Sequence, residues 1–224
     1  MSTSAGSALL LLADGRLPAG SHAHSGGLEE AVADGRVTDT ADLAAYLAGR
    51  LATTGRVDAA LAAAAWPGRA MVMHAEALAR CPSPAWRAAG KAQGRALLRA
   101  GRRMWPTPGL ADLAAACPGG LMWPVALGAV AAAARLSPYD AALVGAQASV
   151  TSPAWAATRL LGLDPFDVAR CQADLADAVD AEAAAAVRWA ATDCDIRQLP
   201  AVSAPLADIG AQRHATWEVC LFAS

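Results

Sequence analysis

Two histidines separated by one residue are the clearest opportunity for metal chemistry in this chain. His22 and His24 lie in the glycine-rich segment 14–30, and imidazoles at this spacing point to the same side only if the backbone is extended. A metal site would need further ligands, which Glu29 or a second chain could supply. The alternative is that both imidazoles hydrogen-bond to nearby backbone. His22 and His24 are therefore only weak candidates for metal ligands, and no cofactor is expected.

Other residues that could do chemistry favour structural roles. Met71, Met73 and His74 stand at helical spacing, which is typical of core packing rather than of a soft-metal site. Three aspartates repeat every third residue, at Asp174, Asp177 and Asp180, and indicate a solvated helix face. Phosphate-binding, dinucleotide-binding, zinc-protease and nucleophile-elbow motifs are missing, and the only lysine is Lys91. No local arrangement of residues therefore indicates a catalytic triad, and a small helical enzyme of unknown reaction stays an alternative.

The segment 14–30 also predicts an unusual backbone. It contains several glycines and Pro18, inside a region that otherwise resembles helix, and glycine permits positive φ and close approach of another backbone. Ser25 can cap a helix that starts near Gly26, with Glu29 and Glu30 in the first turn, where the helix dipole favours negative charge. The plainer interpretation is an ordinary connection between helices.

Composition excludes several classes of protein. Hydrophobic residues make up 55% of the 224 residues and charged residues 17%, which rules out intrinsic disorder. Alanine alone contributes 62 residues, so the core must form by close approach of packed helices. With 18 basic and 20 acidic residues, a nucleic-acid-binding role is not expected. Five cysteines without a C-x-x-C pair, and no signal or membrane-spanning segment, predict a cytoplasmic protein without membrane contact.

Proline after a side-chain acceptor marks several helix starts. Ser83-Pro84, Ser137-Pro138, Ser152-Pro153 and Asp164-Pro165 each combine an N-cap with an N1 proline. Strand patterns are nearly absent. The sequence predicts a single all-α domain, residues 1–224, formed by a compact bundle of roughly eight to ten helices. The expected ranges are about 40–55, 57–79 with a break near Pro67, 84–103, 122–135, 138–150, 153–162 and 165–192. A loop that could include one helical turn is expected over 104–121, and a less regular tail after Pro200.

Short motifs along the whole chain resemble the UreF family of urease accessory proteins. Leu17-Pro18-Ala19-Gly20 and Ser25-Gly26-Gly27-Leu28-Glu29 are similar to its L-P-x-G-x-x-x-x-S-x-G-L-E hallmark. The order of the later matches is also that of the family: Gln93 to Leu98 with Q-G-R-x-L-L, Pro124 to Gly128 and Leu136 to Pro138 with P-V-x-x-G and L-S-P, Ser152 to Leu161 with a helix ending in A-x-R-L, and Leu221 to Ser224 with the R-L-F-x-S end.

Three positions depart from the family pattern. The segment Ser21-His22-Ala23-His24 replaces an aromatic-rich loop, and Gly162 to Pro165 replaces a glutamine pattern. Cys220 stands where an arginine usually precedes the Leu-Phe pair. Arginine and glutamine form directional hydrogen bonds that cysteine and proline do not, so the last two changes bear on partner contacts.

The resemblance implies an all-α scaffold rather than an enzyme. Such a protein would join a UreD/UreH accessory protein and the GTPase UreG, form a homodimer within that complex, and help insert nickel into apo-urease. The alternative function is a nickel-binding metallochaperone acting through His22 and His24. The candidate partner-binding residues are Leu17, Pro18, Gly20, His22, His24, Ser25, Gly27, Leu28, Glu29, Gln93, Gly94, Arg95, Trp217, Leu221 and Phe222.

The C-terminal tail, from about residue 205, is expected to bind a partner. Trp217, Leu221 and Phe222 are large apolar groups in a segment without a predicted long helix, so we expect it not to bury them within its own chain. The resemblance assigns this end to the UreD contact.

Overall fold

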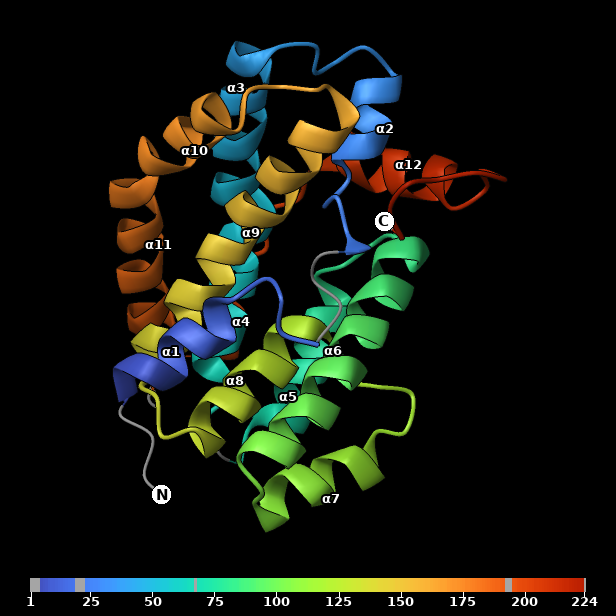
Figure 1. Ribbon diagram of the computed structural model, residues 1–224. Helices are drawn as coiled ribbons and strands as arrows, with labels where there is room; N and C mark the ends of the chain where they lie inside the picture. The colour runs from blue at the N-terminus through green and yellow to red at the C-terminus, as the bar shows by residue number, and fades with distance from the viewer. Residues whose placement is uncertain (1–4, 19–22, 67, 192–194, 224) are drawn as a thin grey trace.

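The computed structural model describes residues 5–18, 23–66, 68–191 and 195–223, and these residues confirm the all-α class (Figure 1). No strand occurs within those ranges. The helices are α1 (Ala5–Ala13), α2 (Leu28–Ala33), α3 (Thr40–Arg50), α4 (Arg56–Ala64), α5 (Ala70–Ala79), α6 (Pro84–Met104), α7 (Pro108–Ala116), α8 (Trp123–Ala133), α9 (Pro138–Leu160), α10 (Pro165–Ala173), α11 (Ala176–Trp189) and α12 (Pro205–His214), with short turns η2 (Leu51–Gly55) and η3 (Ile196–Gln198).

The long helix α9 forms the centre of the bundle and contacts α4, α8, α10 and α11. In Figure 1, α10 and α11 cover its left side, whereas α5, α6 and α7 lie at the lower right. The core is alanine-rich, and its helices approach closely. A Cβ at Gly128 of α8 would overlap the carbonyl of Ala62 in α4. This confirms that close backbone approach builds the core. Within the described ranges, no helix combines the length and apolar character needed to cross a membrane.

Three of the four proline signals mark helix starts as predicted. Ser83 accepts a hydrogen bond from the backbone of Trp86, and Asp164 accepts one from Phe166. Ser137 forms a capping box with Asp140. These signals are local, because the cap and its donor lie within three residues of each other.

The prediction of a new helix at Ser152-Pro153 is wrong, because α9 continues through Pro153. Proline has no N–H for the carbonyl four residues earlier, which belongs to Ser149. Arg50 Nε lies 3.3 Å from that carbonyl oxygen and donates the missing hydrogen bond. A side chain from α3 therefore lets α9 remain continuous.

Other boundaries also differ from the sequence prediction. The expected loop over 104–121 contains the full helix α7, which Thr107 caps, and the expected irregular tail contains α12. The predicted helix 165–192 divides at Asp174–Leu175, so that α10 contacts α3 while α11 follows α9 and α4. The expected end near Gly55 is absent, because the π-helical turn η2 joins α3 to α4. Gly55 is needed there for close contact with Ser149.

Candidate functional site

The loop before α2 is held in place by side chains of α3. The carbonyl oxygen of Gly26 accepts hydrogen bonds from Tyr46 Oη at 2.9 Å and from Arg50 Nη1 at 2.5 Å. Gly26 and Gly27 have φ values of 63° and 85°, a region that favours glycine. A Cβ at Gly27 would lie 3.2 Å from both Tyr46 and Trp86. Glycine is therefore favoured here for two reasons: the positive φ at Gly26 and Gly27, and the lack of space for a Cβ at Gly27.

Ser25 stabilises the start of α2, but the helix begins at Leu28 rather than near Gly26, and Gly27 is its N-cap. Ser25 is fully buried, and its Oγ accepts a hydrogen bond from the backbone N–H of Glu29 at 3.3 Å. Leu17 and Leu28 of the same motif are buried in the core, whereas Pro18 is exposed. Much of the motif therefore acts inside the protein.

The carboxylate of Glu29 holds the C-terminal tail. Glu29 is buried, and its oxygens accept hydrogen bonds from the backbone N–H groups of Leu221 at 2.6 Å and Phe222 at 3.0 Å. His214 Nε2 lies 2.9 Å from Glu29 Oε2. The N–H of Ala223 also donates to the carbonyl of Ala23 at 2.7 Å. We call the contact of Glu29 with His214, Leu221 and Phe222 the tail clasp.

Glu30 forms a second attachment between α2 and the C-terminal segment. It is 3% exposed and forms ion pairs with Arg36 and Arg213, the latter at 3.2 Å. A Cβ at Gly210 would overlap its carboxylate, so α12 lies directly against α2. Both first-turn glutamates thus bind other segments, besides any interaction with the helix dipole.

Burial of Phe222 corrects the expectation for the tail. Phe222 is 5% exposed and packs in the core, with the Arg159 guanidinium 5.1 Å from its ring centroid. Trp217 is half-buried and its ring lies 4.8 Å from that of His214. The tail clasp draws this segment onto the body, so Phe222 is not a free anchor. Leu221 remains 59% exposed.

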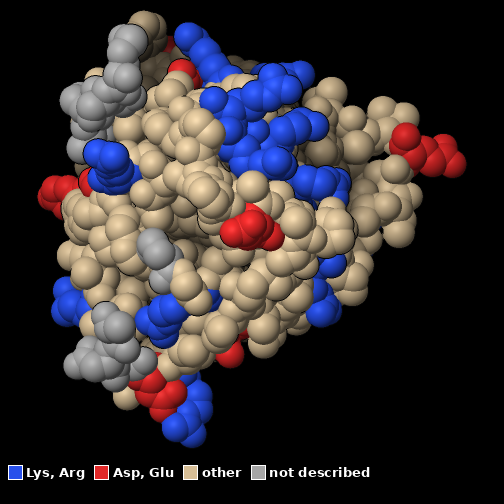
Figure 2. Space-filling view, turned by 90° about the horizontal axis from the view of Figure 1, so that it is seen from below, with Lys and Arg blue, Asp and Glu red and all other residues tan. Residues whose placement is uncertain are grey.

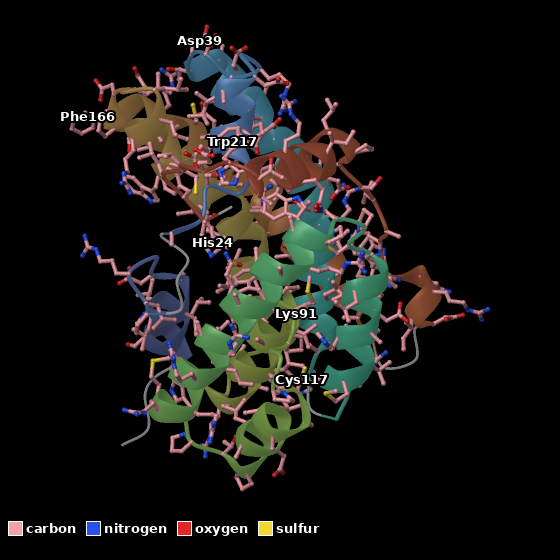
Figure 3. The ribbon with its side chains drawn as sticks, turned by 90° about the vertical axis from the view of Figure 1, so that its right-hand side faces the viewer. His24, Asp39, Lys91, Cys117, Phe166 and Trp217 are labelled. Atoms are coloured by element: carbon pink, nitrogen blue, oxygen red, sulfur yellow. The ribbon has the colours of Figure 1, made fainter. Side chains whose placement is uncertain are left out.

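A cavity of about 170 Å³ lies beside the loop, between α4, α5, α6 and α12. His24 and Gln93, two predicted partner-binding residues, line it together with Arg50, Asp58 and Cys81. In Figure 3, His24 lies between Trp217 above it and Lys91 below it, with Cys117 farther along the molecule. The cavity therefore joins the loop motif to the Q-G-R motif of α6.

Burial raises the pKa of three acidic groups that line this cavity, Asp58, Cys81 and Asp208. Burial raises the pKa of Asp58 to about 7, although nearby Arg50 acts in the opposite direction. Burial, with the charges of Asp58 and Asp208, raises the pKa of the Cys81 thiol to about 11. Burial also raises the pKa of Asp208. A thiol with so high a pKa is a poor nucleophile at neutral pH.

The Q-G-R motif serves three separate purposes. Gln93 faces the cavity, and Gly94 permits contact with the carbonyl of Leu121, which a Cβ would overlap. Arg95 is exposed and its Nη1 donates a hydrogen bond to the carbonyl of Gly119 at 3.1 Å. Only Arg95 offers a charged group to a partner.

The proposed histidine pair is only partly described. Gly20 and His22 lie outside the described residues, so the geometry of His22 and His24 stays a prediction. Among the residues that the structure describes, no group of three or more His, Cys, Asp or Glu side chains could hold a metal ion.

The Met71–His74 cluster is divided between surface and core. Met73 is fully buried, but Met71 is 44% exposed, which corrects its assignment to the core. His74 Nδ1 accepts a hydrogen bond from the N–H of Met122 at 3.1 Å. Burial and the charge of Lys91 lower the pKa of His74. His74 therefore links α5 to the start of α8.

Sequence reasoning missed His214, Arg50, Tyr46 and Asp58 as parts of this site. His214 carried one usable signal, because it stands seven residues before the Leu221-Phe222 pair and a tail histidine can meet a buried acid. The other three lie in ordinary helical sequence, and only the fold brings them to the loop.

Two exposed segments of the described bundle differ in charge. Asp174, Asp177 and Asp180 are exposed, which confirms the predicted solvated face. The opposite charge collects on α6, where no acidic residue occurs.

Fold and site define an all-α protein whose N-terminal loop and C-terminal tail are joined by buried carboxylates. The model of the UreF family matches residues 37–176. A urease accessory protein UreF from Mycobacterium sp. (strain JLS) is 47% identical over 218 residues, covering 96% of this chain and 97% of the relative. Those of Mycolicibacterium vanbaalenii and Mycobacterium tuberculosis are 43% and 42% identical over 96% and 92% of this chain, and over 97% and 92% of their own lengths. The chain belongs to the UreF family of urease accessory proteins.

Proposed function

We propose that this protein is a cytoplasmic scaffold for the maturation of urease. It binds a UreD/UreH-type accessory protein and a UreG-type GTPase, forms a homodimer within their complex, and presents them to apo-urease. Nickel is the cargo that this complex delivers to the urease active site. Membership of the UreF family supports the proposal, because its members are urease accessory proteins.

The observation that carries the proposal is the surface at the tail clasp. Two backbone hydrogen bonds to Glu29 fix the tail, while Val219 and Leu221 remain 84% and 59% exposed. Apolar side chains on an already ordered backbone lose little further entropy when they bind a partner. The tail therefore offers a preorganised docking edge, although Phe222 itself belongs to the core.

The chemistry of this chain indicates which steps its partners must perform. Its sequence has no G-x-x-x-x-G-K-[ST] loop, so a partner must bind and hydrolyse GTP. The Cys81 thiol in the cavity beside the loop has a pKa of about 11, which makes it a poor nucleophile at neutral pH. The protein is thus proposed to be non-catalytic.

Substitution of the two exposed tail residues tests the proposal. Val219→Glu with Leu221→Glu should prevent co-purification with the UreD/UreH-type protein and lower urease activation, because charge disrupts an apolar docking edge. Circular dichroism and the melting temperature should stay close to those of the wild type, since both side chains are exposed.

Phe166→Glu is the matched control, because Phe166 is 85% exposed and lies on α10 rather than on the tail. It should leave the complex intact. Normal complex formation by the double tail variant would show that the tail is not the docking edge.

A further inference from the structure

Helix α6 carries an uninterrupted ladder of positive charge. Basic residues recur every fourth position, and the helix contains no aspartate or glutamate. Figure 2 shows Lys and Arg gathered into one continuous patch on the face seen from below. The basic ladder is formed by Arg87, Lys91, Arg95, Arg99 and Arg103, with Arg102 beside its end.

The pattern acts against the stability of the helix itself. Residues four apart on a helix are neighbours, and like charges at this spacing repel. Positive charges in the first half of α6 also oppose the helix dipole. Only Arg102 and Arg103, in the last turn, interact favourably with it. The stability of α6 therefore does not explain why the basic ladder is present.

Nothing in the described part of the chain neutralises these charges. Its ion pairs involve other basic residues, and none includes a member of the basic ladder. Arg87 and Arg95 donate hydrogen bonds to the carbonyls of Pro82 and Gly119, which position their guanidinium groups without compensating their charge.

The surface beside the ladder is concave. Arg87, Lys91 and Arg95 line a shallow depression, together with Gly119 and Ala88. Leu78 and Pro84 complete the lining, and three basic residues border the space that an incoming side chain would enter. Carboxylates fit this chemistry, because arginine binds them through paired N–H groups.

We propose that the basic ladder of α6 is a docking surface for an acidic face of another protein in the urease-maturation complex. The inference rests on the proposed function and adds a surface distinct from the tail. At about 1.5 Å per residue, the ladder from Arg87 to Arg103 extends roughly 24 Å. A partner helix of several turns, or a strand of several residues, could lie along this length.

A second copy of this chain is a poor occupant. Asp177 and Asp180 lie on α11, at the left of Figure 1, whereas α6 lies at the right. Pairing α6 of one copy with α11 of the next would make a head-to-tail contact, which generates rings or open filaments rather than a closed two-fold dimer.

Other polyanions also match less well. The chain has a net charge of −2, so its other faces repel a long nucleic acid. The only aromatic residue of α6, Trp86, donates its indole N–H to the carbonyl of Ala207 and offers no stacking platform outward. A membrane-surface helix would need an exposed apolar face beside the charges, and α6 buries its leucines.

Charge reversal at alternate positions separates docking from folding. Lys91→Glu with Arg99→Glu converts every repulsive four-residue pair along the ladder into an attractive one. The melting temperature should stay equal or rise, while affinity for the complex of UreD/UreH-type protein, UreG-type GTPase and apo-urease should fall at least tenfold. Wild-type assembly should weaken as salt increases, and the variant should lose that dependence.

Arg170→Glu with Arg197→Glu is the matched control, because it changes net charge equally at two exposed arginines outside α6. It should assemble as the wild type does. A wild type that fails to assemble refutes the proposed function and this inference together. Assembly of the wild type and the ladder variant with equal affinity refutes the docking surface alone.

The single lysine gives a direct assay of the partner. Because Lys91 is the only lysine, a carbodiimide that joins amines to carboxylates without a spacer has one side-chain amine to use in this chain. We expect a cross-link from Lys91 to an aspartate or glutamate of a complex partner. Absence of that cross-link in an assembled complex, or tighter binding of the ladder to a short RNA duplex or to anionic phosphatidylserine vesicles, overturns the inference.

Discussion

Two regions of the molecule hold carboxyl groups away from open solvent, Glu29 buried and Asp58 half-buried, and they stabilise them in opposite ways. At the tail clasp, Glu29 receives two backbone N–H groups and lies beside His214. In the cavity, burial raises the pKa of Asp58 to about 7, and Arg50 is the charge that opposes this shift. The first carboxylate is an anchor that requires its donors, whereas the second is tolerated because it can take up a proton. Burial alone therefore does not identify the role of an acid.

The largest expected effect comes from removing the anchor. Glu29→Ala should lower the free energy of unfolding by about 3 kcal/mol, because it leaves two tail N–H groups and His214 without their acceptor. Chemical denaturation measures this value. Glu218→Ala, at an exposed acid of the same tail, should cost less than about 0.5 kcal/mol. Equal stability of the two variants would mean that the tail clasp is not an anchor.

Asp58→Asn should raise the free energy of unfolding, whereas Glu29→Ala should lower it. The folded-state pKa of about 7 lies above the ordinary value of 3.8, so the folded protein binds the proton more tightly. The contribution of this group is therefore present below about pH 4 and is lost as the pH rises through 7. Asparagine should stabilise the protein by about 2 kcal/mol at pH 8, less than the full shift implies because the cavity admits water.

The same variant should gain little at pH 4.5, where Asp58 is already protonated in the folded state. Denaturation at the two pH values measures the difference. A gain that does not change with pH would place the effect in packing rather than in the charge, and would remove the contrast with Glu29.

Gly27→Ala examines the loop between the two regions. The positive φ of Gly27 and the nearby Tyr46 and Trp86 should make even a methyl group cost about 1–2 kcal/mol. Gly35→Ala is the control for φ alone, since Gly35 also has a positive φ but nothing within 4 Å of a Cβ. The difference in unfolding free energy between these variants gives the packing contribution.

His24→Ala should have the smallest effect on folding. His24 is half-exposed at the cavity, so its removal should change stability by less than about 0.5 kcal/mol. We expect urease activation to fall equally at low and high nickel, as a partner contact requires. A defect confined to limiting nickel would instead favour the metallochaperone alternative.

Local signals in the sequence predicted the fold class and most helix starts. Ser83, Ser137 and Asp164 bind N–H groups within three residues, so each needed only its own neighbours to be recognised. Ser152-Pro153 carried the same signal and failed, because Arg50 from another helix satisfies the carbonyl that proline leaves free. A Ser-Pro pair therefore predicts a helix start unless a side chain from another helix donates the hydrogen bond that proline lacks.

The site was less predictable because the residues that contact one another there are far apart in the sequence. Motif residues Ser25, Gly27 and Glu29 could be identified from the sequence, but the target of the Glu29 carboxylate lies 192 residues away at Leu221. Phe222 resembled an exposed anchor because an isolated tail has no core of its own. Asp58 lies in an alanine-rich helix, where no neighbour in sequence indicates a cavity.

The separation of the two halves of the tail clasp has a consequence for biosynthesis. Glu29 leaves the ribosome 192 residues before Leu221, which at about 5–20 residues per second corresponds to roughly 10 to 40 s. During that interval Glu29 lacks the backbone N–H groups of Leu221 and Phe222, and the exposed edge of the tail does not yet exist. For the docking edge proposed above, a nascent chain therefore could not bind a partner there until translation has passed Phe222, and assembly would follow synthesis of the body of the protein.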